Sequence, residues 1–133
     1  CVGTKDGIII LTDFSIKVLD QVQSIFNKPN QWIQDIKFSP NGNHVAFGAH
    51  GGVSPVVVYS VNNNKLKPFA NINAGLTSAL THLDWDTTSS QLVVNSEAYE
   101  LKFCNVESKS VIRASSCSEI DWYSWTCQIG FPV

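Results

Sequence analysis

The sequence predicts an all-β fold: a segment of a β-propeller made of four-stranded antiparallel blades. In residues 32–52, Ile36 and Phe38 alternate onto one face of a strand, and a turn and a second strand follow. The same pattern returns further along the chain. When Trp85 is aligned with Phe38, 47 residues earlier, Leu83 aligns with Ile36. A period of roughly 40 to 45 residues with about four strands in each period is typical of propeller blades.

Two incomplete copies flank the two complete ones. Near the end of the chain, Ile120-Asp121-Trp122 repeats the apolar-acidic-aromatic start of the pattern. At the beginning, Val2-Gly3, a turn and Ile8 to Leu11 match a later part of it, Phe47-Gly48, a turn and Val56 to Tyr59. The chain therefore contains two full blades and parts of two more.

The predicted strands follow from this alignment. They lie near residues 1–3, 8–11, 15–19, 32–38, 44–48, 56–61, 65–70, 80–85, 91–96, 100–106 and 109–113. Residues 15–19 are expected to form an outer strand with Ile16 and Val18 on one face. Residues 20–31 connect this blade to the next, and 20–26 is the best, though short, candidate for a helix. Residues 118–126 are expected to open a further blade.

The blade boundaries are set accordingly. Residues 1–27 end one blade, 28–74 and 75–116 form full blades, and 117–133 start the next. Two turns support the division: Asn41-Gly42 tolerates the positive φ of a tight hairpin, and Asn62 to Asn64 reads as a solvated turn.

Composition excludes several classes of protein. The chain has 133 residues, a net charge of −2, 15% charged and 44% hydrophobic residues. Its nine basic residues are scattered, so we expect no nucleic-acid partner. No apolar run approaches the roughly 20 residues of a membrane helix, so we expect no membrane partner either.

The four cysteines indicate neither a metal site nor catalysis. Cys1, Cys104, Cys117 and Cys127 form no CxxC pair and have no histidine at zinc-ligand spacing. We expect free, largely buried thiols, with a Cys117–Cys127 disulfide as the alternative.

One polar pattern resembles a catalytic triad. His82 and Asp84 lie two residues apart on a predicted strand, so they share a face, and Ser39 or Ser96 could complete the set.

The repeat offers a simpler explanation for these polar residues. Asp35 aligns with His82, and Lys37 aligns with Asp84, so they are the polar alternates of repeated inner strands. The acid pairs Asp35/Asp84 and Asp84/Asp121 recur for the same reason. We therefore predict no catalytic residue.

The remaining histidines and glycines have equally simple explanations. His44 and His50 flank hairpin turns without a second ligand at metal spacing. The glycine-rich stretch from Gly48 to Gly52 precedes no helix that could bind a phosphate, so it reads as a wide hairpin. No metal and no cofactor are expected.

Aromatic residues mark the core and two weak candidates for partner binding. Phe38, Trp85 and Trp122 share one repeat position and are expected to pack between blades. Trp32 and Trp125 could instead lie on a propeller face and anchor a partner, or else pack within the protein.

Two lysines form the second weak candidate site. Lys65 and Lys67 lie on an outer strand and could meet an acidic partner, or simply form a solvated edge.

Four stretches resemble the echinoderm microtubule-associated protein-like family, which is built of WD-repeat blades: Trp32 to Pro40, Thr81 to Trp85, Asn95 to Leu101 and Glu119 to Val133. The last contains D-W-x-x-x-T-C-x-x-G-F and is the most specific. The resemblance implies two tandem propellers, with this chain in the second. It also implies a non-enzymatic protein of the cytoplasm and the microtubule cytoskeleton that binds tubulin and microtubules.

The sequence departs from the standard WD blade. The Gly-His positions read Lys28-Pro29 and Gly75-Leu76, and the Trp-Asp positions read Leu11-Thr12, Tyr59-Ser60 and Phe103-Cys104. Only Asp6 keeps the turn acid. Packing must therefore replace the buried His–Asp hydrogen bonds of such blades.

The residues alone do not decide between three functions. The first is a cytoskeletal scaffold, with tubulin and the other blades of a longer chain as partners. The second is a WD-repeat scaffold in trafficking or ubiquitin-ligase adaptors. The third is a propeller enzyme that uses Asp35, His82, Asp84 and Asp121 at a central channel.

We expect the chain to be part of a larger propeller, because two blades and two fragments leave sheet faces and edges uncovered. Expressed alone, residues 1–133 should aggregate or remain partly unfolded. Solubility and thermal melting test this, and a sharp two-state transition of a monomer would contradict it.

Overall fold

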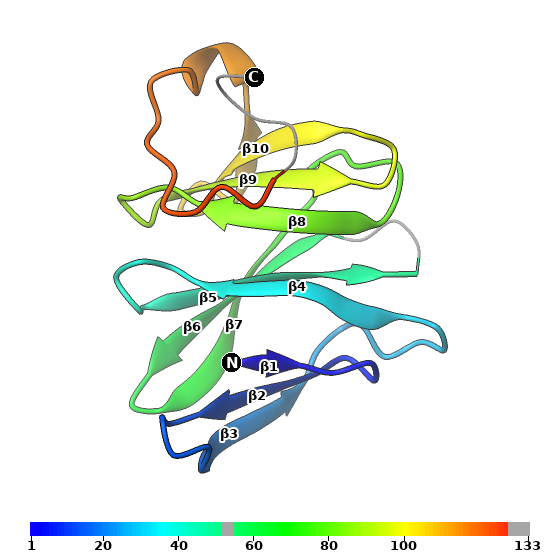
Figure 1. Cartoon of the computed structure of the whole chain (residues 1–133), viewed down its shortest axis with the longest axis vertical. Helices are drawn as coiled ribbons and strands as arrows, with labels where there is room; N and C mark the ends of the chain where they lie inside the picture. The colour runs from blue at the N-terminus through cyan, green and yellow to red at the C-terminus, as the bar shows by residue number, and fades with distance from the viewer. Residues whose placement is uncertain (52–54, 128–133) are drawn as a thin grey trace.

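The computed structural model describes residues 1–51 and 55–127 as three antiparallel sheets, one above the other (Figure 1). In each sheet, spatial order follows sequence order. The first sheet contains β1 (Val2–Gly3), β2 (Ile8–Thr12) and β3 (Val18–Gln23). The second contains β4 (Trp32–Phe38), β5 (His44–His50), β6 (Val56–Asn62) and β7 (Lys65–Ile72). The third contains β8 (Leu80–Trp85), β9 (Gln91–Ser96), β10 (Leu101–Asn105) and β11 (Ser110–Ile112), and a short 3₁₀ helix follows at Ala114–Ser116.

The predicted fold class is confirmed: the described part is almost entirely antiparallel β, with four-stranded sheets. The strands expected in the second and third sheets are all present. None of the helices in the described residues is both long and apolar enough to cross a membrane.

The outer strand of the first sheet was wrongly placed. Residues 15–17, the first part of the expected strand 15–19, belong to a turn, and β3 continues to Gln23 through the region expected to be a connection or a short helix. The Asp13 carboxylate causes the shift, because it accepts hydrogen bonds from the backbone N–H groups of Ser15 (2.9 Å) and Lys17 (3.0 Å). Ile16 adopts a positive φ of 67° in this turn, so it cannot lie on a strand.

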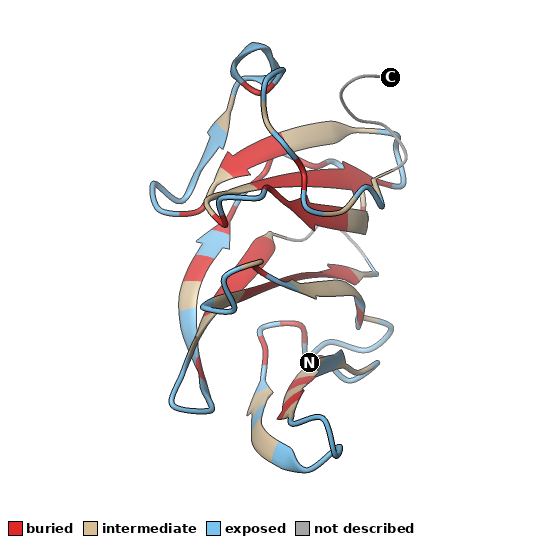
Figure 2. Ribbon diagram, turned by 60° about the vertical axis from the view of Figure 1, so that its left-hand side comes forward, coloured by how far each residue is buried: buried red, intermediate tan, exposed pale blue. Residues whose placement is uncertain are grey.

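Packing between sheets buries the middle strands on both faces (Figure 2). Along β5, Val45 and Phe47 belong to the core between the first two sheets, while Ala46 belongs to the core between the second and third. Strands covered on both sides need continuous apolar runs rather than alternation, and the Val56 to Tyr59 run of β6 has this character.

The prediction that aromatic residues pack between blades is confirmed for Trp85, whereas Trp122 packs the segment after β11 against the third sheet. Trp85 and Trp122 are buried, but Phe38 is 38% exposed. The Trp85 indole N–H donates to the Lys37 carbonyl of β4, the inner strand of the preceding sheet, at 3.0 Å. Among the described residues the first sheet ends at β1 and has no such inner strand, so Phe38 lacks the equivalent cover.

Residues 117–127 do not form the inner strand that we expected to open a further blade. Instead, an isolated antiparallel bridge joins Trp122 to Asp86 at the end of β8, and the Tyr123 N–H donates to the Trp85 carbonyl at 2.8 Å. The rest of the family-like tail, residues 128–133, lies outside the described part, as do residues 52–54, the first of which ends the glycine-rich stretch. The assignment of residues 117–133 to a next blade remains a prediction.

Two glycines allow neighbouring sheets to approach closely. A Cβ on Gly3 would lie 2.3 Å from the Ile33 side chain of β4, and a Cβ on Gly48 would lie 2.6 Å from the Leu80 side chain of β8. The repeat alignment places Ile33 and Leu80 at one position and the two glycines at another. The same contact is therefore made twice, at successive sheet boundaries.

Replacing Gly48 with alanine should destabilise the fold by about 1–3 kcal/mol, because the new methyl group overpacks against the fully buried Leu80. Denaturant unfolding of the protein that carries the chain measures this. In a double-mutant cycle, Leu80→Ala should make Gly48→Ala less costly than it is alone. Equal costs in both backgrounds would show that this contact does not set the sheet spacing.

Candidate functional site

The structure does not assemble the triad-like residues. The Ser39 hydroxyl donates to Asn41 Oδ1 at 2.7 Å, and the Ser96 hydroxyl donates to Glu100 Oε1 at 2.7 Å. His82 Nδ1 is buried without a hydrogen-bond partner, and the hydrogen bonds of Asp84 run to other residues. No proton relay connects these groups.

Asp84 instead is the buried centre of a polar network, which we call the Asp84 clamp: Lys37, Asp84, Ser124, Thr126 and Cys127. Its carboxylate is 1% exposed. It accepts hydrogen bonds from the Ser124 hydroxyl (2.5 Å), the Thr126 hydroxyl (2.8 Å) and the backbone N–H groups of Thr126 (2.9 Å) and Cys127 (2.8 Å). The irregular segment after β11 is thus fastened to β8 by one side chain.

Lys37 connects the clamp to the preceding sheet. Its ammonium group lies 3.0 Å from Asp84 Oδ1 and donates to the Leu83 carbonyl at 2.8 Å and to the Thr126 hydroxyl. Asp35, two residues earlier on β4, accepts a hydrogen bond from the Leu83 N–H at 3.0 Å. These polar side chains of the inner strands therefore bridge β4, β8 and the following segment.

The environment keeps Asp84 ionised. Burial alone would raise its pKa, but the hydrogen bonds from Ser124, Cys127, Thr126 and Lys37 outweigh burial and lower the pKa below its ordinary value of 3.8. The carboxylate has no free lone pair facing solvent and its partners are structural. The clamp is suited to holding sheets in register rather than to acid–base chemistry.

Sequence reasoning identified Lys37 and Asp84 only as polar alternates and missed Ser124, Thr126 and Cys127 as their partners. The available signal was the Thr-Cys pair of the family-like tail. The Thr126-Cys127 pair lies close to Asp121-Trp122 in the sequence. This spacing does not reveal that Thr126 and Cys127 bind the Asp84 carboxylate on β8.

The two candidate tryptophans lie in different settings. Trp32 stacks on His50, its direct cross-strand partner, with ring centroids 4.1 Å apart and an interplanar angle of 11°. His50 Nε2 in turn lies 2.9 Å from Glu97 Oε1, in the β9–β10 turn of the next sheet. Trp32 is therefore part of a contact between sheets, although it remains partly exposed.

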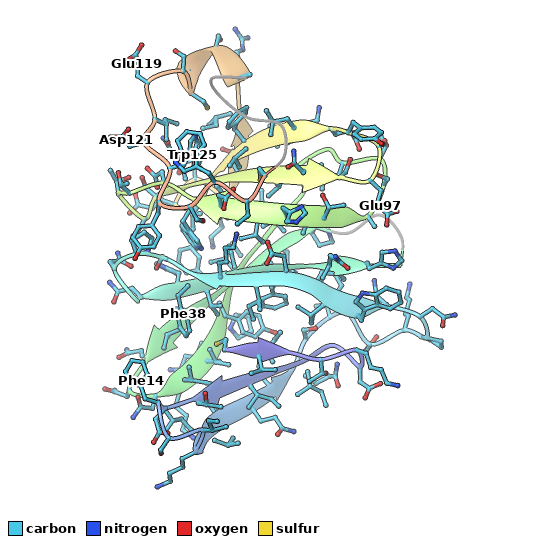
Figure 3. All side chains as sticks on the ribbon, in the orientation of Figure 1. Phe14, Phe38, Glu97, Glu119, Asp121 and Trp125 are labelled. Atoms are coloured by element: carbon cyan, nitrogen blue, oxygen red, sulfur yellow. The ribbon has the colours of Figure 1, made fainter. Side chains whose placement is uncertain are left out.

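Trp125 is 60% exposed and lies beside the third sheet, near Asp121 (Figure 3). Tyr123, two residues earlier, is also exposed. The Asp84 clamp holds the backbone on either side, since Ser124 and Thr126 both bind Asp84. Trp125 is thus an exposed aromatic side chain on a fixed segment.

Lys65 and Lys67 are both exposed on β7, the outer strand of the second sheet. Leu66 between them is buried, and its N–H donates to Asp20 Oδ2 of β3 at 2.7 Å. This hydrogen bond ties the strand that carries the two lysines to the first sheet.

The remaining candidate residues contact side chains of the fold and do not form a metal site within the described residues. His44 lies between Phe69 (4.8 Å between ring centroids) and Trp85 (6.3 Å), and burial lowers its pKa. In the described residues, no three histidine, cysteine, aspartate or glutamate side chains gather as a metal site would require.

The four cysteines are free thiols, so the alternative of a Cys117–Cys127 disulfide is not realised. Burial raises the pKa of the Cys104 thiol to about 12. Burial and the neighbouring Asp84 carboxylate raise the pKa of Cys127 as well. These thiols are protonated and unreactive at neutral pH.

Asp84→Asn should destabilise the protein by about 3 kcal/mol at neutral pH, because it removes the buried charge 3.0 Å from the Lys37 ammonium and leaves that ammonium only the more distant Asp35 carboxylate, at 3.7 Å. Since Asp84 has a lowered pKa when folded, its charge stabilises the fold above the ordinary pKa of 3.8, and this stability is lost as pH falls below it. Denaturant unfolding from pH 7 to pH 3 measures both effects.

The matched control is Asp121→Asn, an exposed acid in the segment next to the clamp, which should change stability by less than about 0.5 kcal/mol. If Asp84→Asn matches this control, or retains the full acid dependence of the wild type, the clamp does not hold the sheets together.

Comparison with known proteins shows which proteins the chain resembles in sequence. No protein-family model matches it. The rat and human proteins named echinoderm microtubule-associated protein-like 1 are 32% identical over 135 residues, which cover 99% of this chain and 16% of each relative. Human echinoderm microtubule-associated protein-like 4 is 29% identical over 134 residues, covering 99% of the chain and 13% of that protein. The chain thus spans 13 to 16% of the length of these relatives.

Solved structures agree on the fold. The C-terminal WD40 domain of Sif2 superposes with a TM-score of 0.64 at 13% identity, covering 84% of this chain and 31% of that one. The β-propeller domain of Cps50 (Swd1) from Myceliophteria thermophila gives the same TM-score and identity, covering 84% of this chain and 35% of its own. At this identity the likeness concerns the fold alone. By sequence the chain is a homologue of the echinoderm microtubule-associated protein-like proteins, and by fold it is a WD-repeat β-propeller segment.

Proposed function

We propose that the chain is part of a non-enzymatic, microtubule-binding scaffold protein. One observation carries the proposal: similarity over 99% of the chain to proteins that are named microtubule-associated. Binding would take place through loops and blade edges, by shape and dispersed polar contacts, without turnover of a substrate. Tubulin and the neighbouring blades of the longer protein would be the partners, and the cytoplasmic microtubule cytoskeleton the location.

The surface is compatible with such a role. Exposed side chains of two kinds, the aromatic Trp125 and the basic Lys65 and Lys67, lie next to residues that are hydrogen-bonded to other parts of the fold. Aromatic anchors and basic groups are common in interfaces with acidic proteins. Placement in the second of two tandem propellers is part of the proposal and depends on the family resemblance.

A WD-repeat scaffold of another pathway, such as trafficking or a ubiquitin-ligase adaptor, is the second candidate, because the fold alone does not specify the partner. An enzyme is less well supported. The acids that could act at a channel, Asp35 and Asp84, already accept hydrogen bonds from their own backbone and side-chain neighbours.

Co-sedimentation with microtubules tests the proposal. The full-length protein that carries the chain should pellet with microtubules, and deletion of residues 1–133 should weaken pelleting while the parts of the protein outside this propeller still melt cooperatively. Pelleting should also weaken as salt rises, since exposed charges are screened.

Chemical cross-linking on microtubules provides a readout without a deletion. Cross-links from lysines within residues 1–133 to tubulin should appear. If the wild type fails to pellet, the microtubule proposal is wrong. Pelleting that survives the deletion, with no cross-links from these residues, would leave the chain as a scaffold for another partner.

A further inference from the structure

The β2–β3 turn presents an unusual set of side chains. Phe14 is fully exposed and points away from the sheets (Figure 3), Ile16 is 80% exposed and Val18 is 54% exposed. Three apolar side chains in solvent within five residues are costly to maintain in a folded domain and often mark an interaction site.

This turn is rigid. The Asp13 carboxylate accepts hydrogen bonds from the Ser15 N–H (2.9 Å), the Ser15 hydroxyl (2.7 Å) and the Lys17 N–H (3.0 Å). Two backbone hydrogen bonds close the turn, from the Asp13 N–H to the Lys17 carbonyl and from the Ile16 N–H to the Asp13 carbonyl. The apolar side chains are therefore presented in one arrangement.

The turn itself does not require apolar residues. The corresponding connection between β6 and β7 is Asn62 to Asn64, and that between β10 and β11 is Val106 to Lys109, with Glu107 and Ser108 at its tip. Asn63, Asn64 and Lys109 also adopt positive φ. Polar residues thus form the tips of the two other outer hairpins, whose connections are shorter, so an outer hairpin does not need an apolar tip.

Basic residues lie beside this tip. Lys17 is in the turn, while Lys65 and Lys67 are on β7, which the Leu66–Asp20 hydrogen bond fastens to β3. None of the three ammonium groups forms an ion pair within the part of the chain that the structure describes. The same edge carries two carboxylates: Asp13 accepts hydrogen bonds within its own turn, and Asp20, which also interacts electrostatically with Lys65, accepts from Leu66 and Gln21.

We propose that Phe14, Ile16 and Val18, together with Lys17, Lys65 and Lys67, form a docking surface for an acidic protein surface that offers apolar side chains. Charge complementarity favours this partner, because the three ammonium groups of this edge outnumber its two carboxylates, which already accept hydrogen bonds within the chain. The apolar tip supplies contact area, and the lysines steer and orient the partner. In its choice of microtubules as the acidic partner, the inference rests on the proposed function.

Substitutions on this surface separate its two components. In the full-length protein, Phe14→Ser with Ile16→Ser should weaken microtubule co-sedimentation by about tenfold or more, as expected for interface anchors. Lys65→Glu with Lys67→Glu should weaken it similarly and flatten its salt dependence, whereas Lys65→Arg with Lys67→Arg should preserve binding.

Matched controls come from elsewhere on the chain. Tyr99→Ser removes an aromatic that is 81% exposed in the β9–β10 turn, and Lys5→Glu reverses an exposed charge in the β1–β2 turn. Both should bind within about twofold of wild type. All variants should keep the wild-type melting temperature, because none of the substituted side chains is buried.

The outcomes distinguish this inference from the proposed function. If wild type pellets and the Phe14/Ile16 and Lys65/Lys67 variants pellet equally well, the inference is overturned and the proposed function stands. If wild type does not pellet, polyglutamate serves as the second probe. Salt-sensitive binding to it that the Lys65/Lys67 charge reversal abolishes supports an acidic partner other than microtubules, and no such binding overturns the inference. Phe14-dependent binding to anionic lipid vesicles, without binding to either acidic probe, also overturns it in favour of a membrane.

Discussion

The contact between Lys37 and the buried Asp84 carboxylate is the interaction on which the arrangement of the sheets depends. It joins the inner strands β4 and β8, which exchange no ladder of backbone hydrogen bonds because they belong to different sheets. The same carboxylate accepts hydrogen bonds from the backbone of Thr126 and Cys127. It therefore connects β4, β8 and the segment after β11. A buried ion pair alone contributes little, but a carboxylate with this many donors specifies a single arrangement and strongly penalises the loss of any partner.

Apolar packing between the sheets stabilises the fold, and the Asp84 clamp fixes how the sheets are arranged. Each middle strand is covered by two neighbouring sheets, and the glycines at the sheet boundaries allow Ile33 and Leu80 to approach the backbone. This packing takes the place of the His–Asp hydrogen bonds of a standard WD blade. The chain thus keeps the propeller geometry with different side-chain chemistry, in agreement with superposition on WD40 domains at 13% identity.

The architecture of the second and third sheets could be predicted because local signals agreed with the repeat. Asn41-Gly42 marked a hairpin, Val56 to Tyr59 marked a strand buried on both faces, and the Phe38–Trp85 alignment fixed the period. The position of β3 could not be predicted, because a single side chain, Asp13, moves the turn by hydrogen-bonding to the backbone. Nothing in the alternation of residues 15–19 reveals that choice.

Candidate sites were harder to predict than strands. The exposure of Phe38 depends on which strands are present beside it, and repeat position alone says nothing of this. The partners of Asp84 lie some 40 residues away in sequence, in a segment whose local pattern suggested a strand. The exposed turn at Phe14 was hidden because Ile16 and Val18 fitted a strand pattern equally well. In each case the deciding contact is long-range or depends on one side chain.

Native-state hydrogen exchange of the Thr126 and Cys127 amides tests the central claim most directly. Neither amide belongs to a strand, yet both donate to a buried carboxylate. The account predicts that they are protected to a degree similar to amides of β8 and β9, and that Asp84→Asn removes this protection before that of the strands. Exchange of both amides at the rate of the exposed Asn62 to Asn64 turn would contradict the claim that the Asp84 clamp holds the sheets and the following segment together.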